Sequence, residues 1–404
     1  MVDFSHLSSI HSLAHPLHQH GSLPVSPLVA TALALTVIVA AAFGGRNGGP
    51  AGVGDDDGPS PESWRGELSP AQRVSRSLTV TVALLTIVAG RLGATNELDN
   101  LAPALVVGAA WPLLILASVA WPPAWRWLDP WDGSARALAA PEGEAGDVRP
   151  AIVSALGWVW YLCAYPHSLH PRAVATALAL YSIVTVAGCL AVGRGAWLGR
   201  AEIFGLLFSW AARVRHGRLI SWQPPRGAEV ALGVLAGGLL FGALKQTAVW
   251  GSLAVSTDAT LYGFVGVMSC AALGGLGLWA LGRWEEHLGA GGGVAAASVV
   301  SVCSIALALA MTRNRVFTSV QLLPALAGDP FGFGWDVLGE AGVGIDPAPL
   351  GITGRILAQA SVLVVGHAAG GAVVAHRTAV PRRVPAFLAL FALQVASMLT
   401  LTQF

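Results

Sequence analysis

Histidine is the residue whose spacing in this chain could support chemistry, because seven of the eleven histidines fall in two short stretches. His18 and His20 are separated by one residue, so in an extended segment their imidazoles point to one face. His167 and His170 lie in a short turn bounded by two prolines, which is a rigid place to hold two ligands. Imidazole nitrogens arranged in this way bind Zn²⁺ or Cu²⁺. The two pairs are therefore candidate ligands of a divalent metal.

Carboxylates follow several of the apolar stretches of the sequence and could complete such a site. Asp99 is a further candidate metal ligand, and Asp329 and Asp336 are candidate catalytic residues. A metal with one open coordination position lowers the pKa of its bound water to about 7, and a neighbouring carboxylate can then act as a general base. This set predicts the hydrolysis of an ester. The alternative is a solvated loop surface on which these groups never meet.

The middle of the apolar stretches holds almost no titratable residue, and His367 is the exception. This scarcity argues against a pump that moves protons or ions along a carboxylate relay. His367 is either a functional group within the bilayer or a neutral histidine bonded to a neighbouring helix. The sequence has no GxSxG, GxxxxGK[ST], HExxH or CxxCH pattern, so none of these motifs identifies an enzyme class for the chain.

Ten long apolar stretches must position these groups. Hydrophobic residues make up 54% of the chain and charged residues 11%, and the mean hydropathy is +0.63, outside the usual balance of a soluble domain. A helix needs roughly 20 apolar residues to cross about 30 Å of hydrocarbon. The sequence predicts an all-α, polytopic transmembrane helical bundle that forms one membrane domain, 1–404. Its spans are expected near 24–43, 77–93, 101–120, 151–165, 172–192, 229–245, 260–282, 294–312, 356–376 and 384–402.

The basic residues predict the orientation of this bundle. With the N-terminus outside, the cytoplasmic side carries seventeen of the 23 lysines and arginines, as the positive-inside rule requires. Both termini are then outside, and the protein is a multi-pass protein of the plasma membrane. The cytoplasmic loops in this topology are 44–76, 121–150, 193–228, 283–293 and 377–383.

Three segments outside the spans have distinct compositions. Residues 1–23 form an extracytoplasmic tail rich in histidine, and 44–76, rich in Gly, Pro, Asp and Ser, is predicted to be a disordered cytoplasmic loop. Within the cytoplasmic interfacial segment 193–228, aromatic residues at helical spacing over 197–215 predict one amphipathic helix at the membrane surface. Membrane lipids are the expected partners. Nucleic acid is not expected, because the arginines are spread along membrane edges and form no single basic stripe.

Several blocks of sequence resemble one known family. They include NELDNLAP at 96–103, DPFGFGWD at 329–336, and Gly366-His367. Their order over nearly the whole chain resembles the fenitrothion hydrolase family of integral membrane proteins, which is widely found in bacteria. The resemblance implies a prokaryotic membrane protein that hydrolyses a P–O–aryl ester. One departure is at Arg313 to Phe317, where relatives carry histidine near an aromatic residue. Arg315 cannot replace a histidine ligand, because a guanidinium has no lone pair to offer.

These observations leave three functional interpretations open. The first is a membrane hydrolase with an outer-face metal site drawn from the histidines and aspartates named above. The second is a noncatalytic protein that binds zinc or copper through its histidine-rich tail. The third is a permease or a scaffold subunit, acting with a partner subunit or as a homo-oligomer.

Overall fold

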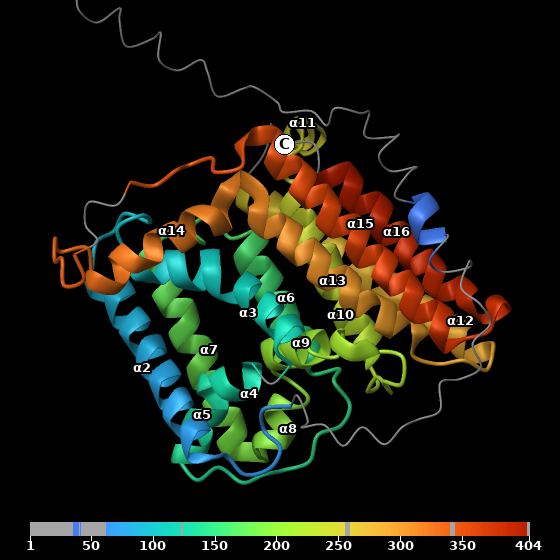
Figure 1. The fold of residues 1–404 in the computed structure, drawn as a ribbon, viewed down its shortest axis with the longest axis horizontal. Coiled ribbons are helices and arrows are strands. Elements are labelled where there is room, and N and C mark those ends of the chain that lie inside the picture. The colour runs from blue at the N-terminus through green and yellow to red at the C-terminus, as the bar shows by residue number, and fades with distance from the viewer. Residues whose placement is uncertain are drawn as a thin grey trace, which may run out of the picture.

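The computed structural model describes residues 35–39, 41, 62–122, 124–254, 259–339 and 344–401. Every regular element in these ranges is a helix (Figure 1). The α-helices are α2 (Pro70–Leu92), α3 (Trp111–Ala120), α4 (Ala124–Leu128), α5 (Pro130–Ala137), α6 (Ala151–Cys163), α7 (Pro171–Val192), α8 (Arg194–Leu198), α9 (Ile203–Ala211), α10 (Ala228–Leu244), α11 (Ala248–Ala254), α12 (Ala259–His287), α13 (Gly293–Met311), α14 (Arg315–Gly328), α15 (Gly351–Arg377) and α16 (Val384–Leu401). A π-helix, η2 (Pro103–Ala110), precedes α3, and short 3₁₀ turns are η3 (Arg215–Gly217), η4 (Thr312–Asn314) and η5 (Val380–Arg383).

Seven helical segments of the described chain are long and apolar enough to cross a membrane. They are Pro70–Leu92, Pro103–Ala120, Pro171–Val192, Thr260–His287, Gly293–Gly328, Gly351–Arg377 and Val380–Leu401. Two shorter apolar helices, α6 and α10, coincide with two further predicted spans. Of the first predicted span, 24–43, the structure describes residues 35–39 and 41. The all-helical class is therefore confirmed, and the apolar helices are compatible with a membrane protein.

The largest group of helices packs around α10 and α13. Sixteen of the nineteen residues of α13 are buried. Small residues bring helix backbones close together here: a Cβ atom on Gly237 of α10 would lie 2.0 Å from the carbonyl oxygen of Cys270 on α12. One turn away, a Cβ on Gly233 would lie 2.3 Å from the carbonyl oxygen of Gly274. Small residues at helix contacts are the usual means of packing in membranes, where apolar surface gains nothing by leaving lipid.

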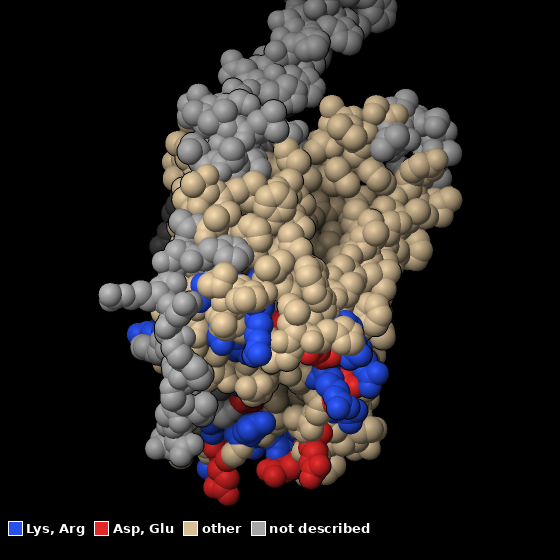
Figure 2. Space-filling model, turned by 90° about the vertical axis from the view of Figure 1, so that its right-hand side faces the viewer, with Lys and Arg blue, Asp and Glu red and all other residues tan. Residues whose placement is uncertain are grey.

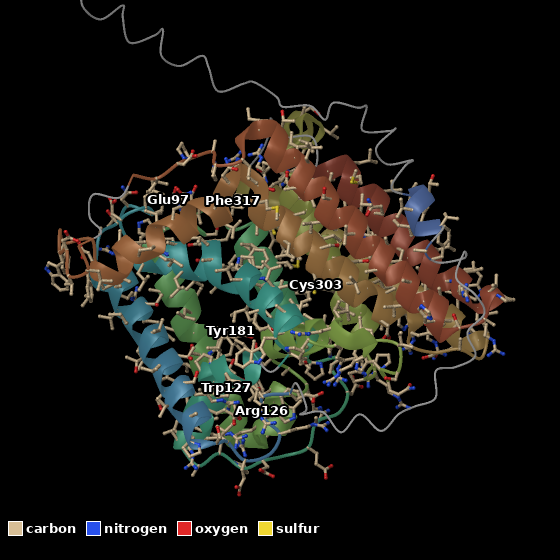
Figure 3. All side chains as sticks on the ribbon, viewed as in Figure 1. Glu97, Arg126, Trp127, Tyr181, Cys303 and Phe317 are labelled. Atoms are coloured by element: carbon tan, nitrogen blue, oxygen red, sulfur yellow. The ribbon has the colours of Figure 1, made fainter. Side chains whose placement is uncertain are left out.

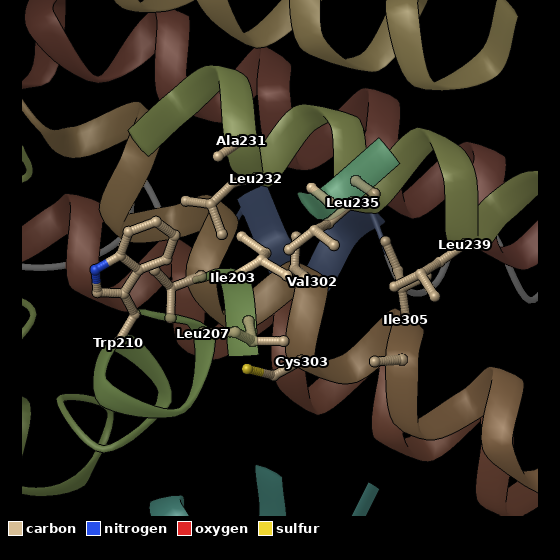
Figure 4. Packing of buried hydrophobic residues seen from close by; sticks show 14 of the residues in the cluster. Ile203, Leu207, Trp210, Ala231, Leu232, Leu235, Leu239, Val302, Cys303 and Ile305 are labelled. Carbon is tan, nitrogen blue, oxygen red and sulfur yellow. The ribbon is translucent and has the colours of Figure 1, made fainter. Parts of the chain in front are cut away.

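The α9 helix differs from the prediction of one amphipathic helix over 197–215. The structure ends α8 at Leu198 and begins α9 at Ile203, and Glu202 caps the new helix by accepting N–H bonds from Phe204 (2.9 Å) and Gly205 (2.5 Å). Eight of the nine α9 residues are buried. Figure 4 shows α9 meeting α10 and α13 in the hydrophobic core. Its aromatic residues therefore pack inward, and the prediction of one continuous helix is wrong.

The predicted loop 44–76 is described from residue 62 onward, and that part is folded. Ser63 is fully buried, and its hydroxyl donates to Asp129 (2.6 Å). Ser69 starts α2 with a capping box, in which its side chain and that of Gln72 each accept the other's backbone N–H. The expected absence of structure therefore does not hold for 62–76, because these local signals outweigh the polar composition of the loop.

A buried group of charges ties α2, α5 and α8 together at one end of the molecule. The Asp132 carboxylate accepts hydrogen bonds from Arg76, from Arg136 (2.7 Å) and from Arg194 (3.2 Å). Asp132 and Arg76 are at most 1% exposed. We call these four residues the Asp132 cluster and this end of the molecule the α8 end. Charged residues gather over the lower part of the face in Figure 2, on the same side as the α8 end in Figure 1.

Candidate functional site

A cavity of about 240 Å³ lies at the opposite end of the molecule, which we call the α14 end. Its walls come from η2, α14 and two connections, 93–102 and 164–170. In Figure 3, Glu97 and Phe317 lie at this end, and Arg126 and Trp127 lie at the other. The residues that line the cavity are Glu97, Leu98, Pro103, Ala104, Leu169, Arg313, Arg315, Thr318, Ser319 and Leu322.

The cavity lies beside a sharp break between α13 and α14. Arg313 (φ 55°, ψ 28°) and Asn314 (φ 56°, ψ 19°) both adopt the left-handed conformation. This region is unusual for residues other than glycine, and strain of this kind costs about 1–3 kcal/mol per residue. Asn314 is held there by a bond from its amide to the carbonyl of Pro347 (2.8 Å). The break turns the chain from α13 into α14, so that Arg313 and Arg315 both line the cavity.

The second wall is the π-helix η2, which ends two residues before a proline. Pro112 lies inside the continuous helical segment Pro103–Ala120, and proline has no N–H to donate. In a π-helix the N–H of residue i donates to the carbonyl of residue i−5, so the partner missing for Pro112 is the carbonyl of Val107. The indole N–H of Trp111 donates to that carbonyl instead (2.8 Å). Single π-turns are rare and frequently occur at functional sites.

Glycine allows η2 and α14 to approach closely beside the cavity. A Cβ atom at Gly108 would lie 1.8 Å from the hydroxyl oxygen of Ser319, so no other residue fits without a shift of the two helices. Ser319 is buried, and Thr318 beside it is half-buried. Their hydroxyl groups add hydrogen-bonding capacity to a wall that is otherwise apolar.

The two most specific sequence blocks, NELDNLAP and DPFGFGWD, lie against one another next to the cavity. The N–H of Ala94 donates to the carbonyl of Phe331 (2.6 Å), and the N–H of Leu101 donates to that of Pro330 (3.3 Å). Asn100 is fully buried and accepts from the N–H of Ala102 (3.0 Å), which fixes the turn that carries Glu97. These blocks therefore shape the wall of the cavity.

Asp329, a predicted catalytic residue, organises its own loop. Its carboxylate accepts backbone N–H bonds from Phe333 (3.0 Å), Gly334 (2.6 Å) and Trp335 (2.9 Å). Slight burial acts to raise the pKa of Asp329, but these bonds outweigh it and hold the pKa below its usual value. A carboxylate engaged in this way is a poor general base, because its lone pairs are already used.

The predicted metal ligands come to the same end of the molecule without forming a metal site. His167 and His170 are exposed in the turn whose Leu169 lines the cavity, and Asp99 accepts from the Asn96 amide (2.7 Å). No group of three or more His, Cys, Asp or Glu side chains that could hold a metal ion occurs among the described residues. The described side chains therefore do not fit the expected metal.

The other predicted site residues lie elsewhere. His18 and His20 are outside the described residues, and Asp336 lies in the loop after Asp329. His367 is fully buried in α15, where its Nδ1 bonds the carbonyl of Leu363 (2.8 Å). Its Nε2 has no partner in the described chain. His367 is thus apart from the cavity lining.

The charges that the structure does bring together are Glu97, Arg313 and Arg315. Arg315 lies close enough to Glu97 and Arg313 for their charges to interact. One carboxylate and two guanidinium groups give the lining a net charge of +1, which favours an anion or a group that becomes negative during a reaction. Sequence reasoning missed this set as a site. The available signal was the position of two arginines on the side of the membrane where arginine is predicted to be scarce.

This arrangement can bind a phosphoryl or carboxyl oxygen through the arginines and place a carboxylate beside it. Guanidinium groups suit such oxygens, because their planar N–H donors match the geometry of the acceptor. Comparisons of the chain with protein-family models, with curated proteins and with solved structures gave no match.

Proposed function

We propose that this chain is an integral membrane protein that binds a small phosphate ester in the cavity between η2 and α14 and hydrolyses it. The observation that carries the proposal is the presence of two arginines and one carboxylate around a single cavity of about 240 Å³. The strained helix break and the π-helix support it, because such features persist mainly where function maintains them. The resemblance to the fenitrothion hydrolase family gives the substrate class.

In the proposed reaction a water molecule attacks phosphorus, and Glu97 accepts a proton from that water. The bond between phosphorus and the aryl oxygen breaks, and the aryl group leaves as an aryloxide. Arg313 and Arg315 stabilise the negative charge that develops on the phosphoryl oxygen. Thr318 and Ser319 offer hydroxyl groups to the remaining ester oxygens. This mechanism uses only side chains that line the cavity.

The test is release of 4-nitrophenolate from a dialkyl 4-nitrophenyl phosphate by full-length protein in lipid nanodiscs. Replacing Glu97→Gln should lower kcat about 100-fold or more with little change in KM, since loss of a general base affects the chemical step. Replacing Arg315→Gln should lower kcat/KM, because the charge on the phosphoryl oxygen loses a stabilising partner. The matched control is Arg172→Gln, which removes an exposed arginine that does not line the cavity.

The outcomes separate the functional classes. Turnover that is equal in Glu97→Gln and wild-type protein would contradict the hydrolytic role. Saturable binding of dimethyl phosphate without any turnover, lost in Arg315→Gln, would indicate a noncatalytic protein that binds or passes anions. Binding that survives in Arg315→Gln would remove this cavity as the site.

The proposal includes a topology and a location. Ten spans with both termini outside would place the cavity on the outer face of a prokaryotic plasma membrane. The support is the unequal distribution of arginine, with the Asp132 cluster at the α8 end.

A further inference from the structure

A second, larger cavity of about 510 Å³ lies at the α8 end, away from the proposed reaction site. Its volume falls in the usual range of small-molecule sites, roughly 300–1,000 Å³. It lies between the segment that precedes α2, the loop after α5, α9 and the chain after η3. The residues that line it are Glu62, Trp64, Arg65, Ala145, Gly146, Gly199, Leu206, Ser209, Trp210, Arg213, Arg218, Ser221, Trp222, Gln223 and Pro225.

Three indole rings contribute to the apolar part of this cavity. Trp64, Trp210 and Trp222 are each at most 8% exposed, so they are fixed by packing. The rings of Trp210 and Trp222 lie 5.9 Å apart, centre to centre, at an angle of 49°. Figure 4 shows Trp210 beside the hydrophobic core at α9, which anchors this wall. Rigid indole faces offer a flat apolar surface to an organic group.

The charged part of the lining is positive. Three arginines, Arg65, Arg213 and Arg218, face one carboxylate, Glu62, which leaves a net charge of +2. Glu62 accepts a bond from Arg213 (2.6 Å), and the Arg213 guanidinium carbon lies 6.0 Å from the centre of the Trp222 ring. Arginine is therefore positioned directly beside the aromatic wall.

Arg213 also has a hydrogen-bond donor to spare. Its Nε is buried and has no partner among the described residues. An unpaired buried N–H is unfavourable, so the Arg213 guanidinium would gain from turning this N–H towards a ligand oxygen. Phosphate is the acceptor that arginine clusters favour, because it offers several oxygens and a full negative charge.

We propose that this cavity binds a phosphate ester, with the phosphate on Arg213 and Arg218 and the organic part against the Trp210 and Trp222 rings. The combination of indole faces and arginines selects the class, because neither a purely apolar ligand nor an inorganic ion uses both. The ester can come from a soluble nucleotide or from the headgroup of an anionic lipid. This site is separate from the hydrolytic cavity and does not depend on its proposed function.

The experiment measures equilibrium binding and thermal stability of the full chain with two probes. Adenosine monophosphate is added to protein in phosphatidylcholine nanodiscs, and phosphatidic acid is incorporated into nanodiscs without nucleotide. Wild-type protein should bind one probe saturably and gain thermal stability from it. Arg213→Gln and Arg218→Gln should each weaken that binding about tenfold or more, the usual effect of losing a hydrogen bond to a charged group.

The matched control is Arg215→Gln, an exposed arginine in the same segment that does not line the cavity. It should bind as wild type does. Arg213→Gln also loses the ion pair with Glu62, so Arg218→Gln decides the outcome if Arg213→Gln melts early without ligand. A response to adenosine monophosphate assigns the soluble source, and a response to phosphatidic acid alone assigns the lipid. No response to either probe, or an equal loss in Arg215→Gln, would overturn the site.

Discussion

At the residue scale, Asp132 accepts hydrogen bonds from three arginines, two of which are buried. It is fully buried, and it accepts from Arg76 and Arg194, which are 1% and 5% exposed. Asp132→Asn would take from the buried Arg76 guanidinium its ion-pair partner, and it would leave Arg194 with only the exposed Glu142 (3.3 Å). Breaking a buried pair from one side typically costs about 3–5 kcal/mol. We therefore expect a large fall in the melting temperature of detergent-purified Asp132→Asn.

The matched comparison is Asp147→Asn. Asp147 pairs with Arg149, whose side chain is 71% exposed, and exposed pairs contribute little to stability. This variant should melt close to wild type. Equal melting temperatures for Asp132→Asn and Asp147→Asn would show that the Asp132 cluster does not hold α2, α5 and α8 together.

Asp129, which caps α5 beside this cluster, should make stability depend on pH. Burial and the neighbouring charge of Asp132 raise the pKa of Asp129 from 3.8 to about 6. Between these two values the folded state binds more protons at Asp129 than the unfolded state does, so the contribution of Asp129 to stability is largest below about pH 4 and is lost as the pH rises through about 6. A shift of this size corresponds to about 3 kcal/mol. Melting temperatures of the purified protein between pH 4 and pH 7 measure the effect.

Asn in place of Asp129 tests the assignment, because it caps a helix as well as aspartate does and does not titrate. The Asp129→Asn profile should lose this fall between pH 4 and pH 6. If the melting temperatures of wild-type protein and Asp129→Asn change with pH in the same way, the pH dependence belongs to groups other than Asp129.

At the element scale, the sequence predicts most helices and few of their irregularities. Long apolar stretches suffice for the spans, because lipid leaves an isolated chain almost no alternative to a helix. The burial of α9 depends on tertiary contacts with α10 and α13, which periodicity does not encode. Pro112 lies within an apolar stretch, so the sequence indicates an irregularity in that helix. The missing N–H of a proline alone does not distinguish a kink from a π-turn.

The sequence predicted loops that lie together at the α14 end, and it did not predict which side chains line the cavity there. The loops with His167, Asp99 and Asp329 do meet at one end of the described structure. However, the Asp329 carboxylate is used by backbone N–H groups, and no third ligand joins the histidines there. In the sequence, Arg313 and Arg315 were noted only as a difference from the family that the chain resembles. The sequence does not show which carboxylates will accept hydrogen bonds from backbone N–H groups. It therefore could not identify Glu97, rather than Asp329, as the candidate general base.

At the scale of the whole molecule, the two cavities lie at opposite ends of the helices. The ligands that can reach each cavity therefore depend on the orientation of the chain in the membrane. The Asp132 cluster and the larger cavity share the α8 end, and the smaller cavity shares the α14 end with the break at Arg313. The positive-inside rule would put the α8 end in the cytoplasm. A nucleotide or inner-leaflet lipid would then reach the larger cavity, and an external ester would reach the smaller one.

Reporter fusions in a bacterial host measure this orientation. Alkaline phosphatase needs disulfides that form only outside the cytoplasm, so its fusion after residue 404 should be active and its fusion in the loop 288–292 should be inactive. A green fluorescent protein that folds only in the cytoplasm should give the reverse pattern at the same two positions. Alkaline phosphatase activity in the 288–292 fusion would show that the orientation is the opposite of the predicted one. The larger cavity would then lie outside the cell, where a cytoplasmic nucleotide could not reach it. If the C-terminus is outside, an N-terminal tag that is also accessible from outside would support ten spans. Nine spans would leave the two termini on opposite sides of the membrane.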